Sequence, residues 1–132
     1  MKTQQMVKEE SVYCKDIHVF IMDGFGYRRI SIYDVLYLEA ASNYCDIHLA
    51  DESKMTVSVP MCEVAEYFPP TLFIRIHRSF VVNLGHISRY VGNLVRMIDG
   101  RDINIGREYR NVVKSRFVLI GSRKRVREGK NV

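Results

Sequence analysis

The strongest constraint on the fold is an alternation of apolar and polar residues across positions 72–77. A period of two is typical of a strand with one buried face. If this strand continued, Arg78 would lie on the same face as Ile74 and Ile76, where a guanidinium without a partner is very unfavourable. The strand is therefore predicted to end or bend near His77 and to leave Arg78 at an exposed corner.

Short apolar runs separated by turn residues continue along the chain, and Asp-Gly pairs at 23–24 and 99–100 indicate hairpins. The predicted strands cover residues 17–22, 27–32, 35–39, 45–49, 55–59, 72–77, 80–82, 86–90, 94–98 and 102–105. Helices are predicted at 60–68, opened by Pro60, and at 107–118. Tight turns and short strands disfavour βαβ units. The sequence thus predicts a mainly β, antiparallel domain with two short helices.

The alternation also predicts which side chains are buried. Inward positions in the middle of the chain are Cys45, Ile47, Leu49, Met55, Val57 and Val59, while Asp46 and His48 are expected to point outward. In the last helix the expected buried face comprises Tyr109, Val112, Val113 and Phe117, and the opposite face carries Arg107, Arg110 and Lys114.

With 132 residues, of which 47% are hydrophobic, the chain can build one domain. We expect a flexible leader at 1–16, the folded domain at 17–118 and a basic tail at 119–132. No apolar run approaches the roughly 20 residues of a membrane span, and no signal peptide is evident at the start. Three scattered cysteines favour a reducing cytoplasm. The net charge of +5 suits a polyanionic partner, although a basic tail is also often only solvated.

Catalysis and metal binding find little support in the sequence. The four histidines are far apart, without metal-ligand spacing, and no phosphate-binding glycine loop is present. His77 lies near Ser79, but no orienting acid accompanies them. His77 is better interpreted as a half-buried side chain that donates to a backbone carbonyl. We therefore expect no enzyme activity, no cofactor and no metal.

Nucleic-acid binding is the stronger hypothesis, because polar tips occur on connecting segments. Asn43 can pair with adenine, Tyr44 can bind a phosphate, and Arg78 can donate two hydrogen bonds to guanine. Arg107 is expected to open the last helix, whose free N–H groups suit a phosphate. For each residue an ordinary surface role, such as a salt bridge or a self-satisfied turn, stays open. The predicted DNA-binding set is Ser42, Asn43, Tyr44, His77, Arg78, Arg107 and Arg110.

The stretch F-x-R-x-H-R-S-F-V-V-N, at residues 73–83, resembles the central motif of the LytTR family of bacterial DNA-binding domains. The resemblance extends upstream to residues 34–44 and downstream to residues 103–109. It implies an elongated β fold whose loops enter successive major grooves. Gly106 departs from the pattern, because the family usually has a small hydroxyl residue there, although glycine is a tolerated N-cap.

The resemblance also implies the contacts and partners. In the family, contacts come from the loop after Glu39-Ala40, from the residue after the motif histidine and from the arginine that opens the last helix. Here these are Asn43 or Tyr44, Arg78 and Arg107. The implied function is transcription regulation through double-stranded promoter DNA, commonly at tandem direct repeats, with a possible homodimer on DNA. A receiver domain, which often precedes LytTR domains, would be separate or missing.

Two other functions remain open. A single-stranded nucleic-acid or RNA-binding β module would need a platform of exposed aromatic side chains, and the aromatic residues here are scattered. A protein-interaction module without DNA affinity could instead pair through an edge strand, for which the predicted hairpin at 94–105 is a candidate.

Overall fold

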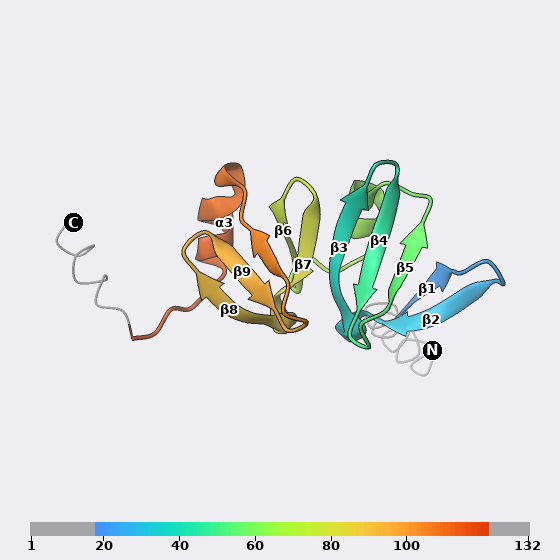
Figure 1. Cartoon of the computed structure of the whole chain (residues 1–132), viewed down its shortest axis with the longest axis horizontal. Helices are drawn as coiled ribbons and strands as arrows, with labels where there is room; N and C mark the ends of the chain where they lie inside the picture. Colours follow the sequence, from blue (N-terminus) through green and yellow to red (C-terminus); the bar gives the residue numbers. More distant parts are fainter. Residues whose placement is uncertain (1–17, 122–132) are drawn as a thin grey trace, which may run out of the picture.

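The computed structural model describes residues 18–121 as an elongated antiparallel β domain (Figure 1). Its strands are β1 (His18–Met22), β2 (Tyr27–Ser31), β3 (Val35–Ala41), β4 (Tyr44–Leu49), β5 (Lys54–Val57), β6 (Phe73–His77), β7 (Phe80–Asn83), β8 (Ile87–Val91), β9 (Leu94–Met97) and β10 (Asp102–Asn104). The helices are α2 (Met61–Ala65) and α3 (Arg110–Ser115), with 3-10 turns η1 (Ile32–Asp34), η2 (Leu84–His86) and η3 (Arg107–Tyr109). The predicted fold class is confirmed. The predicted leader, 1–16, and most of the tail, 119–132, lie outside the described residues.

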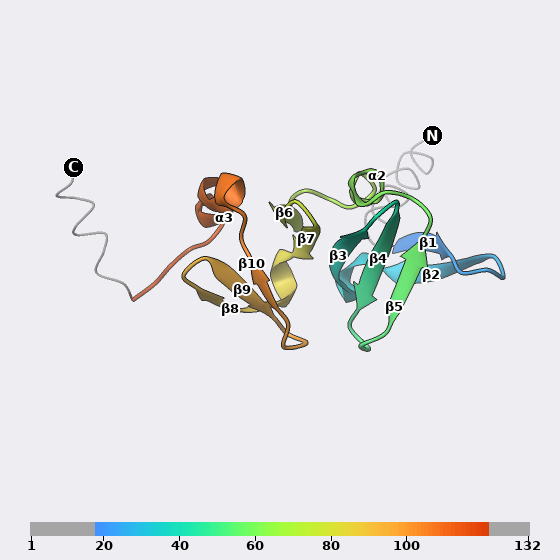
Figure 2. The same cartoon turned by 45° about the horizontal axis from the view of Figure 1, so that its top comes forward.

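The strands form three antiparallel sheets. The central sheet has the order β5-β4-β3-β7-β6, and the other two are β1-β2 and β10-β9-β8. One face of the central sheet packs against β1-β2 and α2, and the other face packs against β8–β10 and α3. Figure 2 shows α2 and α3 on separate parts of the molecule, each beside its own outer layer. Because both faces of β3 and β7 are covered, these two strands contribute apolar side chains to both sides of the sheet.

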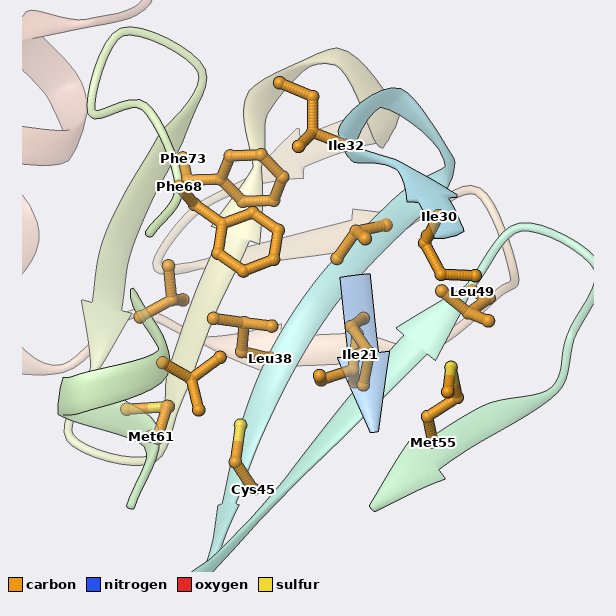
Figure 3. Close-up of a cluster of buried hydrophobic side chains, with 14 residues drawn as sticks. Ile21, Ile30, Ile32, Leu38, Cys45, Leu49, Met55, Met61, Phe68 and Phe73 are labelled. Carbon is orange, nitrogen blue, oxygen red and sulfur yellow. The ribbon is translucent and has the colours of Figure 1, made fainter. Parts of the chain in front are cut away.

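The first core lies between the central sheet, β1-β2 and α2 (Figure 3). Met61, Val64 and Phe68 supply the apolar stripe that the helical spacing predicted. The Phe68 and Phe73 rings meet edge to face, with centroids 4.8 Å apart. Pro60 is the N-cap of α2, and Met61 is its first helical residue. This packing explains why so short a helix holds its place.

The second core lies between the central sheet, β8–β10 and α3. It contains Ile76, Val82, Val95, Met97 and Val113, all with no exposed surface. β6 lies between the two cores: Phe73 belongs to the first and Ile74 to the second. The expectation that β6 has one polar face is therefore wrong at Phe73, because alternation cannot reveal a strand that is covered on both sides.

Several element boundaries differ from the predictions, three of them in β2, β5 and the β3–β4 connection. The β3–β4 connection has only two residues, because Ala41 pairs with Tyr44 and Tyr44 begins β4. The second strand ends at Ser31, whose hydroxyl accepts the N–H of Tyr33 and caps η1. β5 ends at Val57, so Val59 lies beyond the strand and is exposed.

Three predictions of side-chain burial are also wrong. Asp46 is buried and His48 is half-buried, although both were expected to point into solvent. Asp46 accepts hydrogen bonds from Thr56 and Lys54, which compensate its burial. Val112 was expected on the buried face of α3 but is 56% exposed, because the helix rests on the core through Val113 alone. No helix among residues 18–121 is long and apolar enough to cross a membrane.

Asn83, at the end of β7, ties the central sheet to the following turn. Its side chain is buried, its Nδ2 donates to the carbonyl of Val35 at 2.9 Å, and its Oδ1 accepts the N–H of Gly85 at 2.8 Å. These bonds explain why a polar residue ends an apolar strand, since a buried amide must be satisfied.

Replacing Asn83 with alanine should destabilise the fold by about 2–3 kcal/mol, because two backbone groups lose their partners. Urea unfolding followed by circular dichroism measures the loss. Asn104→Ala, an exposed change on β10, is the matched control. A free energy of unfolding within about 0.5 kcal/mol of the wild type for Asn83→Ala would contradict this account.

Candidate nucleic-acid interface

Three connecting segments that are far apart in sequence lie along the same side of the domain, at the top of Figure 1. They are the β3–β4 turn, the β6–β7 turn and the start of η3. The N–H of Ala40 donates to the carbonyl of Ser79 at 2.9 Å, and the N–H of Gly106 donates to the carbonyl of Ile76 at 2.8 Å. These bonds join the first segment to the second and the second to the third. We call this surface the turn edge: Ser42, Asn43, Arg78, Ser79, Gly106 and Arg107.

The β3–β4 turn presents exposed polar side chains. Ser42 and Asn43 are exposed, and Tyr44 is 49% exposed. Ser42 has a φ of 62°, in the left-handed region where tight hairpin turns usually have glycine. A serine in this conformation costs some stability, and such costs are often found at functional sites.

The β6–β7 turn places Arg78 in solvent, as the alternation predicted. His77 is half-buried as expected, but its hydrogen bond runs in the opposite sense to the prediction. Its Nδ1 accepts the backbone N–H of Ser79 at 3.0 Å. In the neutral ring the proton then resides on Nε2, which leaves that nitrogen as a donor. The imidazole also lies edge-on to Phe80, with centroids 5.7 Å apart.

Arg107 and Arg110 are both exposed where the chain leaves β10. The Nε of Arg110 donates to the carbonyl of Ile105 at 3.3 Å, so one side of its guanidinium is held by the protein. The predicted single helix is divided: Arg107 opens the three-residue η3, and Arg110 opens α3. Both η3 and α3 are too short to present a strong helix dipole. Any contribution of Arg107 to phosphate binding therefore comes from its own charge.

Gly106 is explained by packing. A Cβ at this position would lie 3.1 Å from a ring carbon of Tyr109 and 3.8 Å from the Cα of His77. The first distance is too short for an ordinary side chain without a shift of the ring. Gly106 caps η3 without a side-chain hydrogen bond. Gly106 therefore stands in place of the family's hydroxyl residue at a point where η3 comes close to β6.

A charged network anchors the β9–β10 turn to the central sheet just below the turn edge. Arg101 donates from both Nη atoms to the two Glu39 oxygens at 3.1 Å, and His48 Nε2 lies 2.9 Å from Glu39 Oε1. The Arg101 guanidinium also lies 4.9 Å from the Phe80 ring centroid. Alternation alone could not have predicted this network, because Glu39 and Arg101 are 62 residues apart.

Burial and hydrogen bonding shift the pKa values of this network. Burial would raise the pKa of Glu39, but the bonds from Arg101 and His48 outweigh it and hold the pKa below its usual value. Tyr37 donates to Asp99 Oδ2 at 2.8 Å, and burial, followed by that bond, raises its pKa to about 12. Tyr37 is therefore a neutral donor.

Two other groups could suggest chemistry. Glu39, Asp46 and His48 have ligand-type atoms within 4.8 Å of one another. However, Arg101, Thr56 and Lys54 already bind the two carboxylates, so the geometry is that of an ionic network. Cys45 is fully buried, and burial raises the pKa of its thiol to about 12. A thiol that stays protonated is a poor redox switch.

Comparison with known proteins gives the family. The sequence matches the family described as "LytTr DNA-binding domain" over residues 26–117. The chain belongs to the LytTR family. It is thus a DNA-binding domain that acts in transcription regulation. The boundaries at 17 and 118 stay predictions.

A solved structure supports the fold. It is the LytTr DNA-binding domain of a Bacillus cereus protein described as a methyl-accepting/DNA response regulator. The two share 24% sequence identity and superpose with a TM-score of 0.66, over 78% of this LytTR chain and 98% of the other. At this identity the likeness concerns the fold. A comparison with curated proteins gave no match.

In Glu39→Gln the free energy of unfolding should fall less steeply as the pH is lowered than it does in the wild type. A carboxyl whose pKa is lowered by folding stabilises the protein above its unfolded pKa, and this stabilisation is lost as pH falls through the folded pKa. Between about pH 5 and pH 3 the wild type should therefore lose more unfolding free energy than the variant. Urea unfolding at several pH values measures the slope, and Glu108→Gln, on exposed η3, is the control for charge. An unchanged slope in Glu39→Gln would exclude this role of the ion pair.

Proposed function

We propose that this LytTR domain binds double-stranded DNA sequence-specifically by placing the turn edge in successive major grooves. The observation that carries the proposal is that the three segments with the exposed residues Asn43, Arg78 and Arg107 lie along the same side of the domain, although they come from separate parts of the chain. Hydrogen bonds between the three segments hold this arrangement. A protein surface that contacts successive major grooves must hold its contacting side chains in a fixed order. A β scaffold provides such an order.

Each residue has a role that its chemistry suits. Arg78 is proposed to donate two hydrogen bonds to guanine, and Asn43 to pair with adenine. Tyr44, Arg107 and Arg110 are proposed to contact phosphates, and such contacts position the protein without specifying a sequence. Ser42 and His77 flank the two tips and supply further donors, the latter through Nε2.

Further features follow from the resemblance and remain predictions. They are binding to tandem direct repeats, pairing of two copies on DNA, a receiver domain on a separate or longer chain, and a cytoplasmic location. Selection of bound duplexes from a random pool would test sequence specificity and would show whether a repeated motif emerges. Competition between duplex and single-stranded oligonucleotides separates this function from that of a single-strand binder.

A protein-interaction function is a second candidate because of one surface. Phe20, Met22, Phe25 and Tyr27 are 53–100% exposed on β1, β2 and the turn between them. This hairpin lies at the end of the molecule opposite α3 (Figure 1). A pure interaction module would change mass on a sizing column but would show no affinity for DNA.

Arg78→Ala should reduce discrimination at one base position by about 1–3 kcal/mol while leaving affinity for random DNA nearly unchanged. Binding of the selected duplex, its single-base variants and random DNA would be measured over a range of salt concentrations. Arg89→Ala removes an exposed arginine on β8, outside the turn edge, and serves as the control. An equal loss for specific and random duplexes in Arg78→Ala would rule out base reading by Arg78.

A further inference from the structure

The end of β6 departs from a regular ladder. Arg75 pairs with Val81 and His77 pairs with Phe80, so Ile76 is an extra residue and forms a bulge. β6 is also the last strand of its sheet. Bulges re-aim side chains and leave backbone groups to find partners outside the ladder. Here the carbonyls around the corner that carries Arg78 are held by groups outside the β6–β7 ladder.

Arg75 supplies the partners of two of these carbonyls. Its Nε donates to the carbonyl of His77 at 3.2 Å, and its Nη2 donates to the carbonyl of Arg78. The Arg75 side chain is half-buried and is turned back onto its own hairpin. These two bonds commit the edge of the guanidinium formed by Nε and Nη2 to the backbone, so that edge is not available to a base or a phosphate.

The same guanidinium contacts the third segment. Its central carbon lies 6.0 Å from the centroid of the Tyr109 ring in η3. The Tyr109 ring packs on Gly106, whose N–H donates to the carbonyl of Ile76 in the bulge. One side chain thus contacts both the corner that carries Arg78 and the turn that carries Arg107.

We propose that Arg75 is a positioning residue for DNA recognition. It sets the orientation of Arg78, and its spacing from Arg107, without touching DNA. This inference rests on the proposed function, because it concerns how two of the reading residues are held. A planar fork can bind two carbonyls and lie over a ring at once, whereas the ammonium group of lysine cannot. The role therefore requires arginine and not merely a positive charge.

Arg75→Lys tests the proposal because it keeps the charge. In the free protein, amide hydrogen exchange at Ser79 and Gly106 should be faster by about tenfold, since the corner and η3 lose their common brace. The ratio of specific to random DNA affinity should fall by about tenfold, comparable to the loss of one good base contact. Affinity for random DNA and the salt dependence should stay at wild-type values, because the number of neutralised phosphates is unchanged. Arg89→Lys, on β8, is the matched control.

A double-mutant cycle separates positioning from direct contact. In the Arg78→Ala background, Arg75→Lys should cause little further loss of discrimination at the base that Arg78 reads. An undiminished effect there, or a salt slope lower by about one phosphate contact in an Arg75→Gln variant, would show that Arg75 touches DNA itself and would overturn the proposal. Arg75→Gln also serves if the lysine variant does not fold.

The outcomes distinguish this proposal from the proposed function. If Arg78→Ala alone leaves discrimination intact, base reading by Arg78 fails, whatever Arg75 does. If Arg78→Ala behaves as expected but Arg75→Lys changes neither the amide exchange nor the affinity ratio, the positioning role is wrong and the proposed function stands.

Discussion

The bidentate pair between Arg101 and Glu39 is the contact on which the arrangement of this domain most depends. It joins the β9–β10 turn to β3, and so fixes the three-stranded sheet against the central one. Arg101 also lies over Phe80, the first residue after the β6–β7 turn. Because Arg78 belongs to one sheet and Arg107 follows the other, the distance between these arginines is set by how the sheets are docked. Apolar packing of the second core holds the two sheets together, and the ion pair fixes their relative position.

The turn edge is organised by backbone as much as by side chains. Its three segments exchange hydrogen bonds through Ala40, Ser79, Ile76 and Gly106. The residues proposed to contact DNA have exposed side chains on a backbone that is held by these hydrogen bonds. This division suits a protein that needs precise spacing between grooves but must adjust locally to base edges, and it explains why half-buried groups such as Arg75 matter beside exposed ones.

Much of the fold could be predicted from local patterns. Alternation and Asp-Gly turns located nearly every strand, and the clash expected for Arg78 correctly placed the corner. The errors have one physical origin, which is contact between residues distant in sequence. Asp46 and His48 were expected to be exposed because their partners could not be seen, and Val112 was expected to be buried because the sequence does not show that α3 packs on the core through Val113. The role of Gly106 also required the position of the Tyr109 ring. The resemblance to the family suggested the residues proposed to contact bases, and the segments that carry them lie along the same side of the domain.

If duplex DNA contacts the turn edge, an NMR titration of the domain with a duplex recovered by selection should show it. The backbone amides of Asn43, Arg78 and Arg107 should shift most, while that of Gly24, in the hairpin at the far end, should stay unchanged. Large shifts at Gly24, with the three turn-edge amides unmoved, would contradict this contact.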